Sequence, residues 1–430
     1  MTGPGATPGA RKSRAVRTRG PLDGRLRVPG SRSIANRALV CAALASGRSR
    51  LDGVDESDDT AAMREGLRAL GVAVETGDGS WSVEGCGGRL PARGATVDAR
   101  ASGTTARFLT AAATLAAGPT LVDGSARMRE RPIEDLAAAL RALGAPVEVL
   151  GRGGCPPLRV AGGGLPGGRA RIDARRSSQY VSGILLAAPC AAHDVELEFV
   201  EGAAVSRAFL ELTAEVMRAF GAELVLEAGG AKVRTRPYAA RDYGVEPDAQ
   251  SAVYPLAAAA IAGGRVLVAG IPPESRQTDL RVLEVLERMG CRVSRTREGI
   301  ELRGPAEGLR AIDVDMNEIP DAVLALAVVA LFADGASTLR NIAHLRIKES
   351  DRLAALESEL RKLGARAHAG PDSLRIEPGP LRGARIATYD DHRMAMAFAL
   401  AGLRIPGVEI EDPECVAKTW PGYFEALDSL

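Results

Sequence analysis

The sequence is poor in aromatic residues and in side chains that bind metals. Phe, Trp and Tyr make up only 3% of its 430 residues, which argues against base-stacking platforms and aromatic sugar sites. The six cysteines lie far apart without a CxxC pair. The four histidines, which show no ligand spacing, are His193, His344, His368 and His392. We therefore expect no zinc site.

The chain also lacks a long apolar run and a surplus of charge of either sign. The Ala-rich stretch at residues 257–262 is too short to span a bilayer. Lys and Arg number 55 against 54 for Asp and Glu, whereas a general nucleic-acid binder is usually more basic. Scattered cysteines are typical of a reducing compartment. We expect a cytoplasmic protein that binds neither nucleic acid nor a membrane.

Residues 1–20 differ from the rest of the chain in composition. They contain mainly small residues, no acid and no apolar signal region, so they do not form a secretory signal. The cations in this stretch are Arg11, Lys12, Arg14, Arg17 and Arg19. The composition predicts a disordered, solvated basic tail whose removal leaves activity intact.

A repeat organises the remaining chain. An amphipathic helical pattern closed by a glycine recurs at intervals of about 70 residues, and the closing glycines are Gly71, Gly144, Gly221, Gly290 and Gly364. Small apolar segments alternate with this pattern and predict buried helices. Units of this size cannot bury both helices alone, so three and three should form two similar globular domains.

We place the first domain at residues 29–240 and the second at residues 241–430. The opening strand near residues 22–28 could belong to either domain, and we assign residues 21–28 to the second.

The predicted buried helices begin with polar residues. Their first turns read PGSRSIANR, ASGTTAR, RRSSQY, EPDAQSA, NEIPDA and YDDHR. Helix N-termini expose free N–H groups and a positive dipole end, which suit anions. Ordinary N-capping explains one Ser or Asp at each start, but not the arginines that accompany them.

Cations gather near these helix starts, namely Arg127, Arg129, Arg131, Arg346, Lys348, Arg352, Arg393 and Lys418. Salt bridges to neighbouring acids could account for each one singly. Together they favour a small polyanionic substrate in one cleft. Asp321 and Glu349 stand among these cations and are candidates for proton transfer, although each could equally be a cap or an ion-pair partner.

From about Leu22 to Leu430 the chain resembles the 5-enolpyruvylshikimate-3-phosphate synthases. The matching motifs, in family order and spacing, are PGSRSIANRAL, ESDDT, SGTTAR, RMRERPI, SSQY, VEPDAQSA, IPDA, RIKESDR, DDHRMAMA and AKTWP. The resemblance implies an α/β (α+β) fold of two domains, each of three βαβαββ units, of the inside-out α/β barrel type. It also implies that the enolpyruvyl group of phosphoenolpyruvate is transferred to the 5-hydroxyl of shikimate 3-phosphate, with release of phosphate and without a cofactor.

The resemblance further implies a role for individual residues. Shikimate 3-phosphate would be held by Ser33, Arg37, Ser177, Ser178, Gln179, Ser206, Asp321, His344 and Lys348. Phosphoenolpyruvate would be held by Arg32, Gly103, Arg127, Gln179, Arg352, Arg393 and Lys418, with Arg352 and Arg393 on its carboxylate. Asp321, Glu349 and Arg32 would be catalytic. No metal is implied, the partners are the two anionic substrates, and we expect a monomer in the shikimate pathway of aromatic amino acid biosynthesis.

Two positions depart from the family pattern. Arg32 stands where the family motif has lysine, and Ala101 stands where it has asparagine. Arginine keeps the charge of lysine but is larger and planar. A second hypothesis is therefore a secondary-metabolism enzyme of the same fold that eliminates phosphate from shikimate 3-phosphate without phosphoenolpyruvate.

Two further alternatives are the sister UDP-sugar enolpyruvyl transferase and a non-catalytic anion-binding protein. The sister transferase would show a KN pair in the first motif, and this chain has none there. The presence of both Asp321 and Glu349 argues against a non-catalytic protein.

Overall fold

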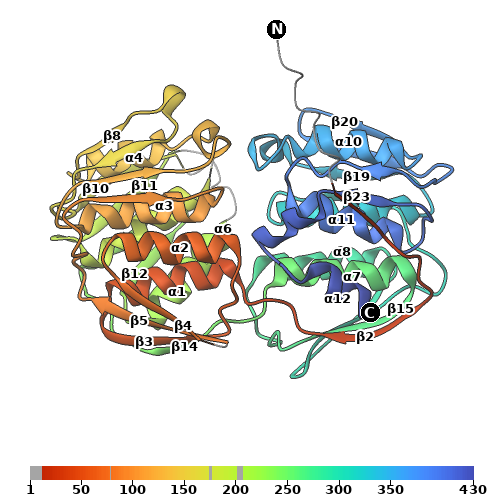
Figure 1. The fold of residues 1–430 in the computed structure, drawn as a ribbon, viewed down its shortest axis with the longest axis horizontal. Helices are drawn as coiled ribbons and strands as arrows, with labels where there is room; N and C mark the ends of the chain where they lie inside the picture. Colours follow the sequence, from red (N-terminus) through yellow and green to blue (C-terminus); the bar gives the residue numbers. More distant parts are fainter. Residues whose placement is uncertain (1–11, 78, 174–176, 201–206) are drawn as a thin grey trace, which may run out of the picture.

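The structure is a computed structural model that describes residues 12–77, 79–173, 177–200 and 207–430. Figure 1 shows two lobes side by side. One hydrophobic core, which includes residues from Ile34 to Val245, lies in the first lobe. The other core contains Leu22, Val28 and the residues from Ala249 to Leu427. Separate cores define two domains, as the sequence predicts.

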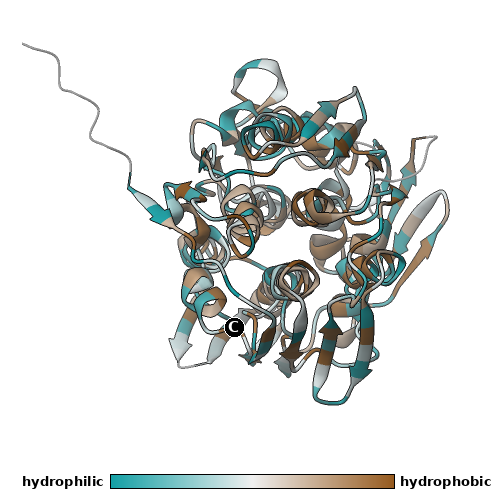
Figure 2. Cartoon of the chain, turned by 90° about the vertical axis from the view of Figure 1, so that its right-hand side faces the viewer, coloured by the Kyte–Doolittle hydropathy of each residue, from teal (hydrophilic) through white to brown (hydrophobic). Residues whose placement is uncertain are grey.

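The inner helices are built from small apolar residues and are buried almost throughout. In the described part of the chain they are α1 (Arg32–Leu44), α3 (Gly103–Ala112), α5 (Ser178–Ala187), α7 (Ala249–Ala262), α9 (Val323–Val329) and α11 (His392–Gly402). Figure 2 shows apolar helices in the interior, with strands around them. A helix that is apolar on all sides has no face for water, so it packs in the centre.

The amphipathic pattern predicted around the closing glycines forms a second helix set. These helices are α2 (Asp58–Ala69), α4 (Glu134–Ala142), α6 (Arg207–Ala219), α8 (Val282–Arg288), α10 (Arg352–Lys362) and α12 (Tyr423–Asp428). Gly71 follows α2 with a φ of 90°, a left-handed conformation that glycine adopts without strain.

Each repeat contributes a small, open sheet with one parallel strand pair. In the first domain, one sheet has the strand order β14 (Asp242–Gly244), β3 (Ser46–Asp52), β5 (Ser80–Cys86) and β4 (Ala73–Gly77). A second sheet has the order β6 (Ala95–Asp98), β7 (Thr120–Asp123), β9 (Leu158–Val160) and β8 (Val147–Val149). A third has the order β10 (Gly168–Ile172), β11 (Val195–Phe199), β13 (Gly230–Val233) and β12 (Leu224–Glu227).

The second domain repeats this pattern. Its sheets contain β16 (Arg292–Thr296), β17 (Gly299–Arg303), β15 (Gly264–Ala269) and β2 (Leu22–Leu26); β18 (Asp313–Asp315), β19 (Ser337–Arg340), β21 (Ser373–Glu377) and β20 (Arg366–Ala369); and β1 (Ser13–Ala15), β23 (Glu409–Glu411) and β22 (Arg385–Ile386). The order β6-α3-β7-α4-β8-β9 is the βαβαββ unit that the resemblance implies.

The two domains exchange a strand where the chain passes between them. β2 precedes the first unit but pairs in parallel with β15 of the second domain. β14 pairs in parallel with β3 of the first domain, and Val245 belongs to the first core. β14 therefore completes the first sheet, although the predicted boundary at residue 241 assigns it to the second domain. We propose a boundary after Val245, and the core membership supports it.

The predicted disordered tail is wrong for residues 12–20, while residues 1–11 lie outside the described part. β1 pairs antiparallel with β23, and Arg14 forms ion pairs with Glu425 and Asp428. β1 thus supplies the antiparallel partner of β23 in the sheet of the sixth repeat. An edge strand left unpaired would expose its N–H and C=O groups.

Candidate active site

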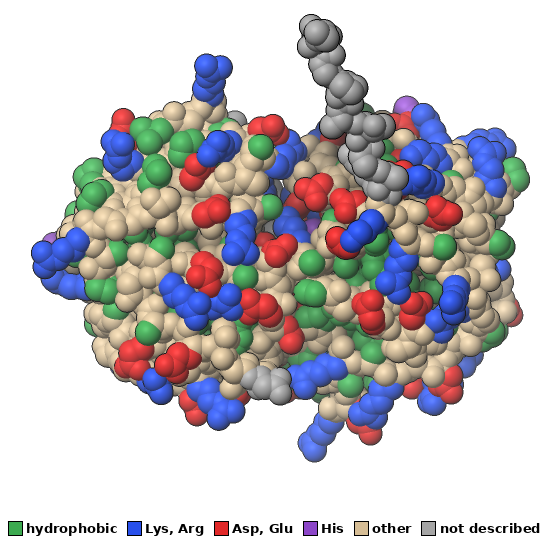
Figure 3. Space-filling view, in the orientation of Figure 1, with side chains coloured by type: hydrophobic (Ala, Val, Ile, Leu, Met, Phe, Trp, Pro, Cys, Tyr) green, Lys and Arg blue, Asp and Glu red, His purple; other side chains and the backbone are tan. Residues whose placement is uncertain are grey.

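A cleft between the two domains collects the N-terminal ends of the inner helices. Its lining includes Arg32, Ser33, Asn36, Arg37, Asp59, Gly103, Thr104, Arg107, Arg131, Ser177, Ser178, Gln179, Tyr180, Gln250, Asp321, His344, Lys348, Glu349, His392, Arg393 and Lys418. On the outer face that Figure 3 shows, cations and acids are interspersed, whereas cations predominate in the cleft. The predicted convergence of helix starts on one cleft is confirmed.

Side-chain caps fix several of these helix starts. The Ser102 hydroxyl accepts from the Thr105 amide, and the Ser177 hydroxyl accepts from the Gln179 amide. In the second domain, Asp248 caps α7 and Asp391 caps α11. The capping explanation is thus correct for these residues, and it also orients the first-turn side chains toward the cleft.

The first domain holds two of its cleft arginines, Arg37 and Arg107, with neutral acceptors. Arg37 donates to the Thr213 hydroxyl at 2.7 Å and to the Ser33 carbonyl at 2.6 Å. Arg107 donates to the carbonyls of Gly103 and Pro132. Burial lowers the pKa of Arg37 to about 9, and burial with the nearby Arg131 charge lowers the pKa of Arg107 to about 10. Both remain cationic at neutral pH, and no carboxylate of the described residues pairs with either.

Arg131 and Lys348 also line the cleft. Among the described residues, neither side chain has a hydrogen-bond partner within 3.5 Å or an ion-pair partner within 4.0 Å. Burial lowers the pKa of Lys348, and the charges of Asp321 and Glu349 oppose this effect. Cations that are directed into a cleft without a partner are suited to an anionic ligand.

The second domain pairs its arginines with carboxylates. Arg352, only 1% exposed, donates to both carboxylate oxygens of Asp391 at 2.7 and 3.1 Å. It also reaches Asp321 at 3.0 Å and Glu349 at 3.0 Å. Burial alone would lower the pKa of Arg352, but Asp391, Glu349 and Asp321 raise it well above its ordinary value. Arg352 is therefore the centre of a buried ion network.

Asp321 and Glu349 are held as anions in this state. Burial would raise the pKa of Asp321, but Arg393, at 3.1 Å, and Arg352 hold it well below its ordinary value. Burial would likewise raise the pKa of Glu349, which Lys418, at 2.8 Å, and Arg352 hold low. Each carboxylate stays ionised until a ligand takes its cations.

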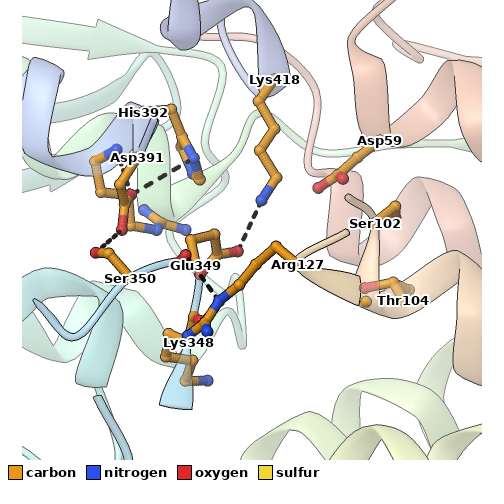
Figure 4. A network of polar contacts seen from close by, with 12 residues as sticks. Asp59, Ser102, Thr104, Arg127, Lys348, Glu349, Ser350, Asp391, His392 and Lys418 are labelled. Atoms are coloured by element: carbon orange, nitrogen blue, oxygen red, sulfur yellow. Dashed lines mark hydrogen bonds and ion pairs between the residues drawn. The ribbon is translucent and has the colours of Figure 1, made fainter. Parts of the chain in front are cut away.

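Two sets of contacts join the domains across the cleft. Arg32 pairs with Asp59 at 2.8 Å within the first domain and donates to Gln250 of the second domain at 3.3 Å. Arg127 donates to the Lys348 carbonyl at 2.8 Å and to the Glu349 carbonyl at 3.2 Å. Figure 4 shows that Arg127 reaches the segment that carries Glu349, and that Lys418 pairs with the side chain of Glu349.

Two histidines in the cleft are neutral, of which His392 is buried and His344 is half-buried. Burial, then the Lys348 charge, lowers the pKa of His344 to about 4. Burial, then Lys418, lowers the pKa of His392 well below its ordinary value. Neither ring nitrogen of His392 has a hydrogen-bond partner among the described residues. An imidazole without a partner leaves hydrogen-bonding capacity for a ligand.

Most predicted site residues line the cleft, with three exceptions. Arg352 lies behind Asp321 and Glu349, so it reaches the cleft through their carboxylates. Arg127 lies at the cleft edge and is occupied by backbone carbonyls. Ser206 lies outside the described residues. The positions of the other predicted residues agree with the expected site, and their roles stay predictions.

The predicted roles leave out Asp59, Arg107, Arg131, Gln250 and His392, although Arg131 is among the cations that the sequence gathers near the helix starts. Asp59, Arg131 and His392 lie within the motifs ESDDT, RMRERPI and DDHRMAMA, so the motifs offered a signal. Gln250 carries no charge and stands in a helix start that capping by Asp248 already explains. Only its spatial position, beside Arg32 and Arg393, identifies it.

The fold and the cleft define a two-domain α/β protein that binds small anions between its domains. The family model for EPSP synthase (3-phosphoshikimate 1-carboxyvinyltransferase) matches residues 16–427, and the chain belongs to this family. It is 46% identical over 412 residues to 3-phosphoshikimate 1-carboxyvinyltransferase of Methanoculleus marisnigri, covering 95% of this chain and 97% of the relative. It is 47% identical over 415 residues to that of Nitrosomonas europaea, with coverage of 95% and 96%.

A solved structure of EPSP synthase from Acinetobacter baumannii superimposes with a TM-score of 0.82 at 27% identity, covering 97% of this chain and 98% of the other. The two-domain inside-out α/β fold expected from the sequence is confirmed, and the sheets do not close into a barrel. No helix in the described ranges is long and apolar enough to cross a membrane.

Proposed function

We propose that this protein transfers the enolpyruvyl group of phosphoenolpyruvate to the 5-hydroxyl of shikimate 3-phosphate and releases phosphate. In one cleft, cations without an ion-pair partner among the described residues lie opposite two carboxylates, each of which is paired with other cations. This observation carries the proposal. Both substrates carry a phosphate and a carboxylate, so a site that binds them together needs fixed positive charge. An addition and an elimination each need a proton to be moved.

The first-domain face suits shikimate 3-phosphate. Ser33, Ser177, Ser178, Gln179 and Arg37 line this face, and Lys348 and His344 approach from the second domain. Ser206 belongs to the same proposed set. Their hydroxyl, amide and guanidinium groups offer donors for a phosphate and for ring hydroxyls without a competing carboxylate.

Phosphoenolpyruvate would lie nearer the domain junction. Arg32, Gly103, Gln179, Lys418 and Arg127 would surround its phosphate, and Arg393 with Arg352 would hold its carboxylate. Gly103 allows close approach because a Cβ there would come within 2.9 Å of the guanidiniums of Arg107 and Arg131. Arg127 must first leave the carbonyls that it contacts in this state.

Ligand binding would activate Asp321 and Glu349 as proton carriers. When phosphoenolpyruvate takes Arg393 and Arg352 as partners, Asp321 loses the charges that hold its pKa low. Its pKa then rises toward the range in which it can accept the proton of the 5-hydroxyl. Glu349 would take up a proton when the ligand draws Lys418 and Arg352 away from it, deliver that proton to C3 in the addition and recover it in the elimination, while Asp321 passes the hydroxyl proton to the departing phosphate. Closure of the domains excludes water during both steps.

Product analysis tests this proposal directly. With both substrates, the protein should release phosphate and form the enolpyruvyl ether, at a rate that depends on phosphoenolpyruvate. Release of phosphate from shikimate 3-phosphate alone would instead support the elimination hypothesis. The relatives at 43–47% identity, all of which are named as carboxyvinyltransferases, favour the first outcome. A monomeric state and a cytoplasmic location stay predictions.

A further inference from the structure

Gln250 lies between two arginines that come from different domains. It stands in the first turn of α7, is 7% exposed and lines the cleft. Its amide oxygen accepts from Nη2 of Arg393 at 2.5 Å and from Nη2 of Arg32 at 3.3 Å. Arg32 begins α1 in the first domain, so this one oxygen joins the two sides of the cleft.

The orientation of the Gln250 amide is determined by its surroundings. Burial raises the pKa of Asp279, in the short helix Thr278–Arg281, to about 7, and its interaction with Gln250 opposes this rise. The amide oxygen of Gln250 accepts from both arginines, so its amide nitrogen is left to face the Asp279 carboxyl group. The reversed amide would direct its N–H groups at two guanidiniums, which only donate. The geometry therefore leaves one favourable orientation.

The neutrality of Gln250 matters as much as its position. Arg32 already has Asp59 as a carboxylate partner, and Arg393 has Asp321. A third carboxylate between them would add a negative charge beside the two guanidiniums, where an anionic ligand is expected to bind. An amide oxygen provides a hydrogen-bond acceptor without adding a negative charge.

We propose that Gln250 is a positioning residue: a neutral acceptor shared by Arg32 and Arg393, it holds the two guanidiniums at the spacing that binds the anionic groups of phosphoenolpyruvate. This inference rests on the proposed function. It deepens that function, because it explains how arginine at position 32 can be held in place while remaining available to the substrate. It also makes Gln250 a determinant of phosphoenolpyruvate affinity rather than of shikimate 3-phosphate affinity.

Two substitutions at this position separate acceptor geometry from charge. Gln250→Met keeps the length of the side chain but removes both hydrogen-bonding groups, and we expect the KM for phosphoenolpyruvate to rise about tenfold. Gln250→Glu keeps an acceptor and adds a negative charge, and we expect a rise of about 100-fold. The KM for shikimate 3-phosphate should change by less than about twofold in both.

A matched control distinguishes positioning from a general loss of stability. Thr114→Val removes a buried hydrogen bond, donated to the Ala111 carbonyl at 2.7 Å, outside the cleft. We expect this variant to lower the melting temperature without changing either KM. If Gln250→Met does not fold, the nearly isosteric Gln250→Glu still tests the proposal.

The test uses steady-state kinetics, together with calorimetric titration of phosphoenolpyruvate in the presence of shikimate 3-phosphate. The proposal is overturned if both Gln250 variants keep the KM of the unmodified protein for phosphoenolpyruvate, or if Gln250→Glu binds it as tightly as the unmodified protein does. If the unmodified protein binds phosphoenolpyruvate without turnover, and Gln250→Glu weakens that binding, the proposed function fails while the role of Gln250 stands. A complete absence of phosphoenolpyruvate binding to the unmodified protein would overturn both.

Discussion

The two faces of the cleft hold their arginines by different means. In the first domain, Arg37 and Arg107 donate to hydroxyl and carbonyl oxygens, and burial lowers the pKa of each. In the second domain, Arg352 and Arg393 are paired with carboxylates, which raise the pKa of each against the effect of burial. Apart from Arg32, which pairs with Asp59, the first face keeps uncompensated positive charge, whereas the second keeps ion pairs that a ligand can rearrange.

This difference assigns a task to each face. Uncompensated cations attract an anion before any other group moves, so the first face is ready to bind shikimate 3-phosphate. Ion pairs release a carboxylate only when a competing anion takes its cation, so the second face links phosphoenolpyruvate binding to proton transfer. Substitutions on the two faces should therefore affect different kinetic constants.

The largest effect is expected for Asp321→Asn. Loss of the carboxylate removes the proposed proton acceptor, and we expect kcat to fall by about 10³, with a much smaller change in the KM for shikimate 3-phosphate. Steady-state kinetics would measure both constants. Asp313→Asn is the matched control, because Asp313 pairs with Arg340 on the surface of the same domain. A kcat of Asp321→Asn within threefold of the unmodified protein would contradict the role of the second face.

The second prediction compares how the two faces stabilise their arginines. Asp391→Asn disturbs the buried pair with Arg352, and we expect the free energy of unfolding to fall by about 3–5 kcal/mol. Thr213→Val removes the acceptor of Arg37, and we expect a fall of about 1–3 kcal/mol. Denaturant titration of the two variants measures the difference. Equal losses would remove the energetic distinction between the faces.

The third prediction concerns Gly103 on the first face. The methyl of Gly103→Ala would lie 2.9 Å from guanidinium nitrogens of Arg107 and Arg131. Both side chains must shift, and we expect the KM for phosphoenolpyruvate to rise about tenfold, because anion binding depends on their positions. Initial-rate measurements at saturating shikimate 3-phosphate provide the value. An unchanged KM would show that the phosphate does not approach this backbone.

The sequence predicted the cleft better than it predicted the role of each side chain. Polar first turns on apolar helices identified where the chain gathers N–H groups and cations, because that pattern is local. Short strands such as β1 and β14 carry three residues each, too few for an alternating pattern. The expectation that Arg352 contacts the substrate stays a prediction, but the sequence gives no sign that three carboxylates enclose this side chain, because such enclosure depends on tertiary packing.

The smallest effect concerns the pH dependence of stability. Burial and Lys348 lower the pKa of His344 from an ordinary value of 6.5 to about 4. As the pH falls between these values, the unfolded chain binds a proton that the folded chain does not, so stability decreases. His344→Asn should reduce the loss of stability between pH 7 and pH 5 by about 1 kcal/mol. If both proteins lose the same amount of stability, the pKa of His344 is not lowered in the folded protein.

Calorimetric titration of each substrate into the unmodified protein tests the central comparison most directly. If the first face is ready and the second must be rearranged, shikimate 3-phosphate binds by itself, and phosphoenolpyruvate binds tightly only after shikimate 3-phosphate has been added. Tight binding of phosphoenolpyruvate to the free protein, or no binding of shikimate 3-phosphate alone, would contradict this account.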